Sequence, residues 1–210
     1  MQDADPDTAR EQMVTSLVDR TDITDTAVID ALRTVPRHAF VPVAQRSAAY
    51  TDRPLPIGDH QTISAPHMVA RMTALLDLDA GDRVLEIGTG SGYHAAILAE
   101  IVGDGNVYSI ERRASLAHAA RDRLAQLDYD VLVRTDDGRN GWPDAAPFDA
   151  AVLTCAPPTL PSAIPAQLDV GGIIVAPVGQ TDQTLIRAVV RSDGTLERES
   201  HGAVQFVPLQ

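Results

Sequence analysis

The sequence Arg83-Val-Leu-Glu-Ile-Gly-Thr-Gly-Ser-Gly-Tyr93 carries the strongest structural signal in this chain. Its apolar residues 84–87 predict a buried strand, and glycines follow at 88, 90 and 92, just before a helical pattern. Glycines in such a turn let backbone N–H groups approach a ligand closely. A second predicted strand, Asn106-Val-Tyr-Ser-Ile-Glu111, ends in a carboxylate that can accept from two ribose hydroxyls. The sequence therefore predicts a pocket for a nucleoside-type cofactor at the carboxyl edge of a parallel sheet.

The spacing of these glycines distinguishes between cofactors. A dinucleotide-binding fingerprint has glycines at its first, third and sixth positions. Here the sixth position is Tyr93, and Gly92 comes one residue early. With Glu86 two residues before Gly88, the run resembles motif I of the class I S-adenosylmethionine-dependent methyltransferases. That resemblance implies S-adenosyl-L-methionine as cofactor, although glycine-rich turns also occur in other α/β proteins.

Length and composition indicate one domain over residues 1–210. We expect residues 1–80 to form an N-terminal helical cap on the substrate side, and residues 81–210 to form the cofactor-binding core. The apolar content of 44% is ordinary for a globular protein. Charges or prolines interrupt every apolar run before it reaches the length of a membrane span, and the acidic residues 1–7 do not resemble a secretory signal. A single cysteine, Cys155, excludes an internal disulfide and favours a cytoplasmic location.

The formal net charge of −12 indicates which partners to exclude. It argues against nucleic acid and against anionic membranes, which both require clustered cations. The chain also has no lysine, and aspartate exceeds glutamate. We hypothesise a salt-rich cytosol, such as that of a halophilic archaeon, where screening weakens the repulsion between acidic groups. GC-rich codon use is the alternative, but it does not explain the acidity. The spacing of the histidines, the cysteine and the acidic residues predicts no metal site.

The order of predicted elements indicates an α/β fold. We expect helices over 7–20 and 24–35, the second capped by Thr24 and stopped by Pro36, and a third that starts near Pro66. From residue 83 strands and helices alternate, which predicts a Rossmann-like, mostly parallel, doubly wound sheet with helices on both faces. The predicted strands are 83–87, 106–111, 130–134, 148–154, 172–178 and 184–191; the predicted helices are 93–102 and 114–127, and the last apolar segment is 203–209.

A second motif, ahead of the predicted sheet, indicates the substrate. Gln61-Thr-Ile-Ser-Ala-Pro-His-Met68 matches without a gap the signature of the protein-L-isoaspartate (D-aspartate) O-methyltransferases, and the resemblance extends over nearly the whole chain. It implies transfer of a methyl group from S-adenosyl-L-methionine to the α-carboxylate of L-isoaspartyl residues, and thus repair of damaged proteins and peptides. Other segments that match the family are Val35–Val41, Asp137-Gly138, Gly141-Trp142, Gly171-Gly172 and Phe206–Leu209.

The resemblance also implies roles for particular residues. Ser64 becomes the catalytic residue, whose hydroxyl holds a substrate carboxylate oxygen, and Ile63, Ala65 and His67 line the substrate position. A carboxylate is already nucleophilic and a sulfonium methyl is already activated, so positioning can supply most of the catalysis. The residues implied on the cofactor side are Glu86, Gly88, Gly90, Glu111, Asp137 and Gly138.

Simpler roles exist for several of these residues. Ser64 could cap the helix that begins near Pro66, His67 could be a surface residue of its first turn, and Asp137 could be one more solvated aspartate. The sequence assigns no role in the site to four other residues. Cys155 is expected in the core, Trp142 at the cofactor rim or against the sheet, and His94 and His118 as ordinary helix residues.

The chain departs from the family pattern at three positions. The family usually has glycine where this chain has His60 and Asp136, and alanine where it has Pro157. A histidine in the turn before Gln61 leaves the peptide specificity open. The alternatives are another class I carboxyl or small-molecule methyltransferase, a non-catalytic module that binds S-adenosylmethionine or recognises damage, and, more distantly, an NAD-dependent oxidoreductase. We expect a monomer.

Overall fold

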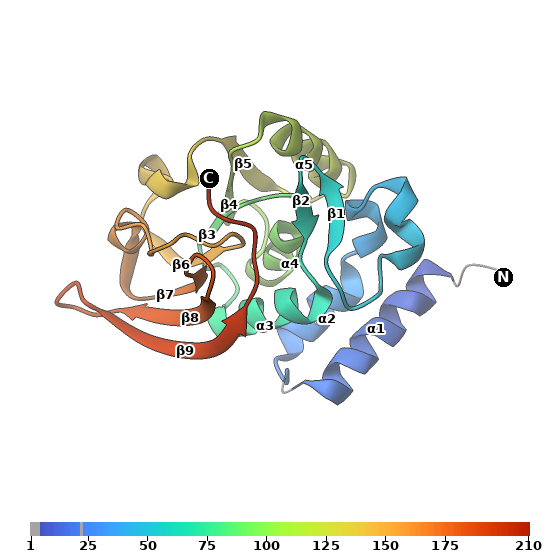
Figure 1. Cartoon of the computed structure of the whole chain (residues 1–210), viewed down its shortest axis with the longest axis horizontal. Helices are drawn as coiled ribbons and strands as arrows, with labels where there is room; N and C mark the ends of the chain where they lie inside the picture. Colours follow the sequence, from blue (N-terminus) through green and yellow to red (C-terminus); the bar gives the residue numbers. More distant parts are fainter. Residues whose placement is uncertain (1–4, 22) are drawn as a thin grey trace.

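The computed structural model describes residues 5–21 and 23–210, and within them a seven-stranded sheet runs in the order β5-β4-β3-β6-β7-β8-β9 (Figure 1). The strands from β5 to β7 are parallel, whereas β8 and β9 run antiparallel to their neighbours. The mostly parallel α/β sheet predicted from the sequence is confirmed. The bounds are β3 Val84–Ile87, β4 Val107–Glu111, β5 Val131–Thr135, β6 Phe148–Leu153, β7 Leu168–Val178, β8 Gln183–Val190 and β9 Leu196–Val204.

The two faces of the sheet are covered differently. Val84 and Val107 face α3 (Pro66–Leu76) and α4 (Tyr93–Val102) in one apolar cluster. The helix that follows β4 is α5 (Ala114–Gln126), which contacts β4 and β5. Leu85 and Ile87 point to the opposite face, because side chains alternate along a strand. The residues that cover this second face come from short 3-10 turns and irregular chain between 142 and 168, and from residues 207 and 209. α-Helices on both faces were expected, but the connections after β5 and β6 form only 3-10 turns.

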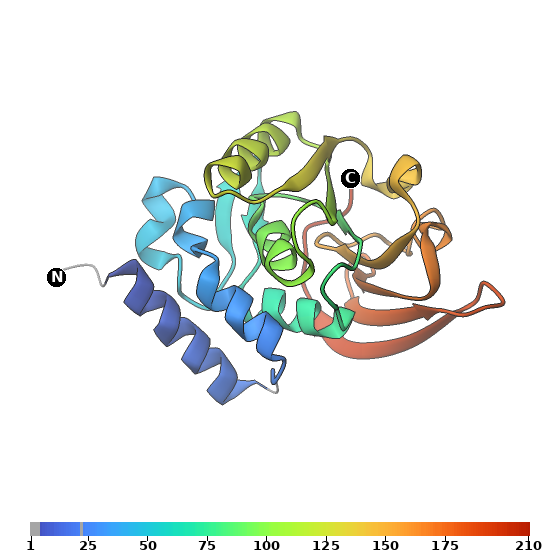
Figure 2. The ribbon, with the colours of Figure 1, turned by 180° about the vertical axis from the view of Figure 1, so that it is seen from behind.

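The amino-terminal elements pack against α4 (Figure 2). Leu17, Leu32 and Phe40 form one apolar cluster with Tyr93 and Ile97 of α4, which explains why α4 is apolar on nearly all sides. The elements in this part are α1 Pro6–Arg20, α2 Thr26–Thr34, 3-10 turns at Arg37–Phe40 and Val43–Ala48, and a hairpin of β1 Leu55–Gly58 and β2 Gln61–Ile63.

The predicted limits of α2 are partly wrong. The helix ends at Thr34, before Pro36, as expected. Its cap, however, is Asp25 rather than Thr24, because the Asp25 carboxylate accepts from the backbone N–H groups of Ala27 and Val28 at 2.9 and 3.3 Å. A carboxylate at the positive end of a helix is a stronger cap than a hydroxyl one residue earlier.

The last strand was not predicted, because most of its residues are polar. β9 begins at Leu196 and continues through exposed Glu197, Arg198 and Glu199 at the outer edge of the sheet. The chain then turns back toward the middle of the sheet, where Ala156 N–H donates to Val207 O at 2.8 Å and Leu209 N–H donates to Ala156 O at 2.9 Å (Figure 1). This return places the carboxyl-terminal segment beside the end of β6.

Candidate active site

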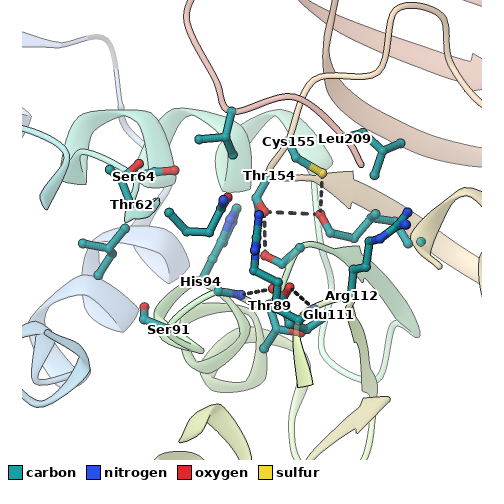
Figure 3. A pocket seen from close by; sticks show the side chains of 18 of the residues that line it. Thr62, Ser64, Thr89, Ser91, His94, Glu111, Arg112, Thr154, Cys155 and Leu209 are labelled. Atoms are coloured by element: carbon teal, nitrogen blue, oxygen red, sulfur yellow. Dashed lines mark hydrogen bonds between the residues drawn. The ribbon is translucent and has the colours of Figure 1, made fainter. Parts of the chain in front are cut away.

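A cleft opens at the carboxyl ends of β3, β4 and β6, where the chain leaves β3 toward β4 on one side and β6 lies on the other. Ligands of open α/β sheets bind at such a point. Figure 3 shows Thr62 and Ser64 on one side of the cleft, Thr154, Cys155 and Leu209 on the other, and Thr89 and Glu111 below. Residues far apart in the sequence therefore meet at one place.

The glycine turn after β3 forms the floor of this cleft. Gly88 N–H donates to Ile110 O at 2.8 Å, and the positive φ of +102° at Gly88 turns the chain out of the strand. A Cβ on Gly88 would lie 2.3 Å from Thr154 Oγ1, so only glycine fits here. The Thr154 hydroxyl donates to Gly88 O at 2.6 Å and ties β6 to the turn.

Glu111 presents its carboxylate to the cleft from the end of β4. Its Oε2 accepts from Gly90 N–H and its Oε1 accepts from Arg113 N–H, both at 2.9 Å. Only 8% of the residue is exposed, so the carboxylate has one well-defined orientation. It can accept from neighbouring hydroxyls, as the sequence predicted for a ribose.

Glu86 lies beneath the turn and does not reach the cleft wall. It is fully buried, and its carboxylate accepts from the Ser109 hydroxyl, which also contacts Thr89 Oγ1 at 2.5 Å. Burial raises the pKa of Glu86 to about 8, and the nearby Glu111 adds to the rise. Its Oε1 has no hydrogen-bond partner within the described residues, so this buried oxygen can still accept a donor.

Ser64 lies between β2 and α3, and it lines the cleft. The residue at the cap position of α3 is Ala65, which makes no side-chain cap, while Asp52 Oδ1 accepts from His67 N–H at 3.0 Å. Asp52 thus takes the capping role considered for Ser64. The Ser64 hydroxyl makes no hydrogen bond within residues 5–21 and 23–210, which leaves it available to a ligand.

The neighbours of Ser64 differ in their positions. Ile63 lines the cleft, whereas Ala65 and His67 do not. The His67 ring bonds to Asp52 Oδ1 through Nδ1 at 2.8 Å, and 41% of its side chain is exposed. This position matches the simpler interpretation of His67 as a residue of the first helical turn.

Asp137 and Gly138 follow β5. Gly138 lines the cleft, and a Cβ there would lie 2.4 Å from Ile87 Cγ2. Asp137 lies outside the cleft wall, and hydrogen bonds from Arg139 lower the pKa of its carboxyl to about 2. It stays ionised near the rim, where Arg112 Nη1 lies 3.9 Å from Asp137 Oδ2.

The cleft also contains residues that sequence analysis missed. His94 lies in α4, as expected, but it is buried and lines the cleft. Thr73 Oγ1 donates to Val69 O at 2.8 Å, so His94 Nε2 is the donor in its 2.9 Å contact with Thr73. Burial lowers the pKa of His94 to about 4, and the ring is neutral at pH 7. Other missed lining residues are Thr62, Thr89, Ser91, Arg112, Thr154 and Gln210.

The structure also places Cys155 and Trp142. Cys155 is buried, as expected, but it also lines the cleft, where burial raises the pKa of its thiol to about 12. Trp142 packs edge-on against Tyr108 with a centroid distance of 5.5 Å and lies under Arg134. Its contact is therefore with the sheet.

Comparison with known proteins identifies the family. The family model described as protein-L-isoaspartate (D-aspartate) O-methyltransferase matches residues 8–210. The chain belongs to this family. Among curated members, it is 50% identical over 202 residues to the protein-L-isoaspartate O-methyltransferase of Methylorubrum extorquens, covering 96% of this chain and 88% of the relative. It is 52% identical over 184 residues to protein-L-isoaspartate O-methyltransferase 1 of Archaeoglobus fulgidus, covering 87% and 84%.

Solved structures agree with this family. A protein-L-isoaspartate O-methyltransferase superposes with a TM-score of 0.86 at 25% identity over 95% of this chain, which spans 65% of that protein. A Plasmodium falciparum protein in complex with S-adenosyl-L-homocysteine gives a TM-score of 0.83 over 96% of this chain and 98% of that one. Its 23% identity makes this a likeness of fold. The class I methyltransferase fold predicted from motif I is confirmed.

Two features are absent from the part of the chain that the structure describes. None of its helices combines the length and the apolar character needed to cross a membrane. Within the same residues, no three histidine, cysteine or acidic side chains gather as metal ligands would.

Proposed function

We propose that this protein transfers a methyl group from S-adenosyl-L-methionine to the α-carboxylate of L-isoaspartyl residues in damaged proteins and peptides. The observation that carries the proposal is that the free hydroxyl of Ser64 and the anchored carboxylate of Glu111 line one cleft. The relatives named for this activity, at about 50% identity over most of the chain, support it.

The residues of the cleft fit the cofactor. Glu111 offers acceptors for a ribose diol, and the glycine at 88 leaves room that a Cβ would fill, while Glu86 lies buried beneath the turn. We assign the cofactor side to Glu86, Gly88, Gly90, Glu111, Asp137 and Gly138. When bound, S-adenosyl-L-methionine supplies an activated methyl group and leaves as S-adenosyl-L-homocysteine.

The residues of the chain act mainly by positioning. In our proposal the Ser64 hydroxyl donates to one oxygen of the substrate carboxylate and leaves the other oxygen to attack the methyl carbon. Ile63 shapes the adjacent wall, and Ala65 and His67, outside the cleft wall, are proposed to support the Ser64 loop at the start of α3. The attacking group is already an anion, so no residue needs to remove a proton from it. Excluding water from the substrate carboxylate and the cofactor methyl group strengthens the hydrogen bond from Ser64.

Labelled S-adenosyl-L-methionine and paired peptides test this proposal. The two peptides differ only in an aspartyl or isoaspartyl linkage, and base-labile label on the isoaspartyl peptide alone is the expected result. Equal labelling of both peptides would indicate a general carboxyl methyltransferase. Cofactor binding without label would indicate the non-catalytic module in which His60 has abolished turnover.

The proposal also covers the domain organisation, oligomeric state, location and salt dependence of the protein. We propose a single domain over residues 1–210, a monomer that acts in the cytoplasm without nucleic-acid or membrane partners. The relatives come from bacteria and from archaea, and they give no support to an origin in a halophilic archaeon. The net charge of −12 supports only the coarser hypothesis that salt stabilises the fold. Melting temperatures that do not rise from low to molar KCl would remove that hypothesis.

A further inference from the structure

Arg37 is the largest fully buried side chain of the protein among the described residues, and it lies directly behind the substrate-side loop. It belongs to the 3-10 turn Arg37–Phe40, and none of its surface is exposed. Within residues 5–21 and 23–210 no carboxylate forms an ion pair with it. Burying an unpaired guanidinium is costly, and burial accordingly lowers the pKa of Arg37. The contacts of its guanidinium must therefore offset the free-energy cost of burying the charge.

The guanidinium joins three segments of the chain. Its Nη2 donates to Ser64 O at 2.7 Å, and its Nε donates to Ala49 O at 2.9 Å. Its Cζ lies 4.8 Å from the centre of the Tyr93 ring, which follows the glycine turn directly. Hydrogen bonds from a charged donor are short and strong, and the planar group fixes their directions.

These contacts relate the two halves of the cleft to one another. Ser64 lies on the substrate side, and Tyr93 begins the helix on the cofactor side. One rigid side chain therefore sets the distance between the Ser64 backbone and the turn that holds the cofactor. The Ser64 hydroxyl forms no hydrogen bond with any residue that the structure describes, so its position depends on this backbone.

We infer that Arg37 is a positioning residue for methyl transfer, which holds the Ser64 loop at the correct distance from the glycine turn. The inference rests on the proposed function. A misplacement of about 1 Å at a reacting centre can cost about 100-fold in rate. Arg37 touches neither reactant in this arrangement, because it bonds to the carbonyl of Ser64 and is covered on all sides.

Arg37→Lys tests the inference, because lysine keeps the charge but cannot form the two-pronged contact with Ala49 O and Ser64 O. We expect kcat on an isoaspartyl peptide to fall about 10- to 100-fold. The Kd for S-adenosyl-L-homocysteine should change less than about twofold, since the contacts of Glu111 are intact. Hydrogen exchange over residues 61–69 should become faster than in the wild type, with β3 and β4 unchanged.

Arg187→Lys is the matched control. Arg187 Nε also donates to a backbone carbonyl, Leu75 O at 2.9 Å, but it lies on β8, away from the cleft. The Arg187→Lys substitution should lower the melting temperature without lowering kcat. An equal loss of kcat in the control would overturn the inference, and so would a wild-type kcat in Arg37→Lys or a loss of cofactor affinity equal to the loss of rate.

A second variant covers the case in which Arg37→Lys does not fold. Tyr93→Leu removes the ring below the guanidinium, together with its edge-on contact with Phe40, and a smaller loss of kcat with faster exchange over residues 61–69 is expected. Unchanged kcat and exchange in this variant would overturn the inference. The exchange measurement needs no turnover, so an inactive wild type would contradict the proposed function while leaving the role of Arg37 to be judged by exchange.

Discussion

The backbone N–H of Gly90 donates a hydrogen bond to Oε2 of Glu111 over 2.9 Å. The turn after β3 and the end of β4 are thus tied together before any ligand arrives. Glu111 has two functions in this arrangement: it supports the glycine turn, and it offers its remaining lone pairs to the cleft. Substitutions at this position should separate the two.

Glu111→Gln should weaken binding of S-adenosyl-L-homocysteine by about 10- to 100-fold, because a hydrogen bond to a charged group contributes about 1.5–3 kcal/mol. At saturating cofactor, kcat should fall much less. Glu111→Ala should add a loss of stability, since the N–H groups of Gly90 and Arg113 lose their acceptor. Calorimetric titration and thermal melting measure both effects. Glu100→Ala, on the exposed side of α4, is the control, and a fall in kcat without a change in Kd would contradict the assignment.

Ser64→Ala should have the opposite pattern. The hydroxyl makes no hydrogen bond within the described chain, so its removal should leave stability and cofactor affinity nearly unchanged. We expect kcat to fall about 10- to 100-fold through loss of one hydrogen bond to the substrate carboxylate. Steady-state kinetics with an isoaspartyl peptide measures this, with the exposed Ser162→Ala as control. Equal losses of rate and cofactor affinity would show that Ser64 has been misassigned.

His60→Gly should stabilise the protein. His60 has a φ of +58° in the turn between β1 and β2, where the family usually has glycine. This left-handed conformation costs a non-glycine residue about 1–2 kcal/mol, whereas glycine adds only about 0.4–1 kcal/mol of freedom to the unfolded chain. The difference between these ranges is a net gain of up to about 1.6 kcal/mol in the free energy of unfolding, which chemical denaturation measures. His118→Ala, on α5, controls for the loss of a histidine, and a lower stability of His60→Gly would show that His60 makes a compensating contact.

Glu86→Gln should change how stability depends on pH. The folded-state pKa of Glu86 is raised from 4.5 to about 8, so its contribution is complete below pH 4.5 and is lost as the pH rises through 8. Between these values the unfolded chain releases a proton that the folded protein keeps. Glutamine cannot titrate, so the advantage of the variant should grow from pH 5 to 8, by at most about 1.4 kcal/mol per pH unit. Denaturation at several pH values measures it, with Glu100→Gln as control; parallel curves for variant and wild type would mean that Glu86 is ionised in the folded state.

Local patterns predicted the centre of the fold well. The strand before the glycine turn, the helix that starts at Pro66 and the acid at the end of β4 each depend on residues that are close in the sequence. The apolar character of β3 and the geometry of glycine and proline were sufficient for these elements.

The errors have a common physical origin in long-range contacts. The cleft position of His94 results from contacts made across the molecule, such as the one with Thr73. The carboxyl-terminal segment reaches the cleft by pairing with Ala156, which no local pattern reveals. Each of these features depends on a partner that is distant in the sequence.

The charged outer strand β9 has one more consequence. An open sheet edge is a template on which another chain can add a strand, and acidic and basic side chains along the edge oppose such addition. Glu197, Arg198 and Glu199 lie at this edge of the sheet and are exposed. The polar residues that made β9 difficult to recognise therefore also oppose the addition of a strand from another chain. Such aggregation would be a particular hazard for an enzyme whose substrates are damaged protein chains.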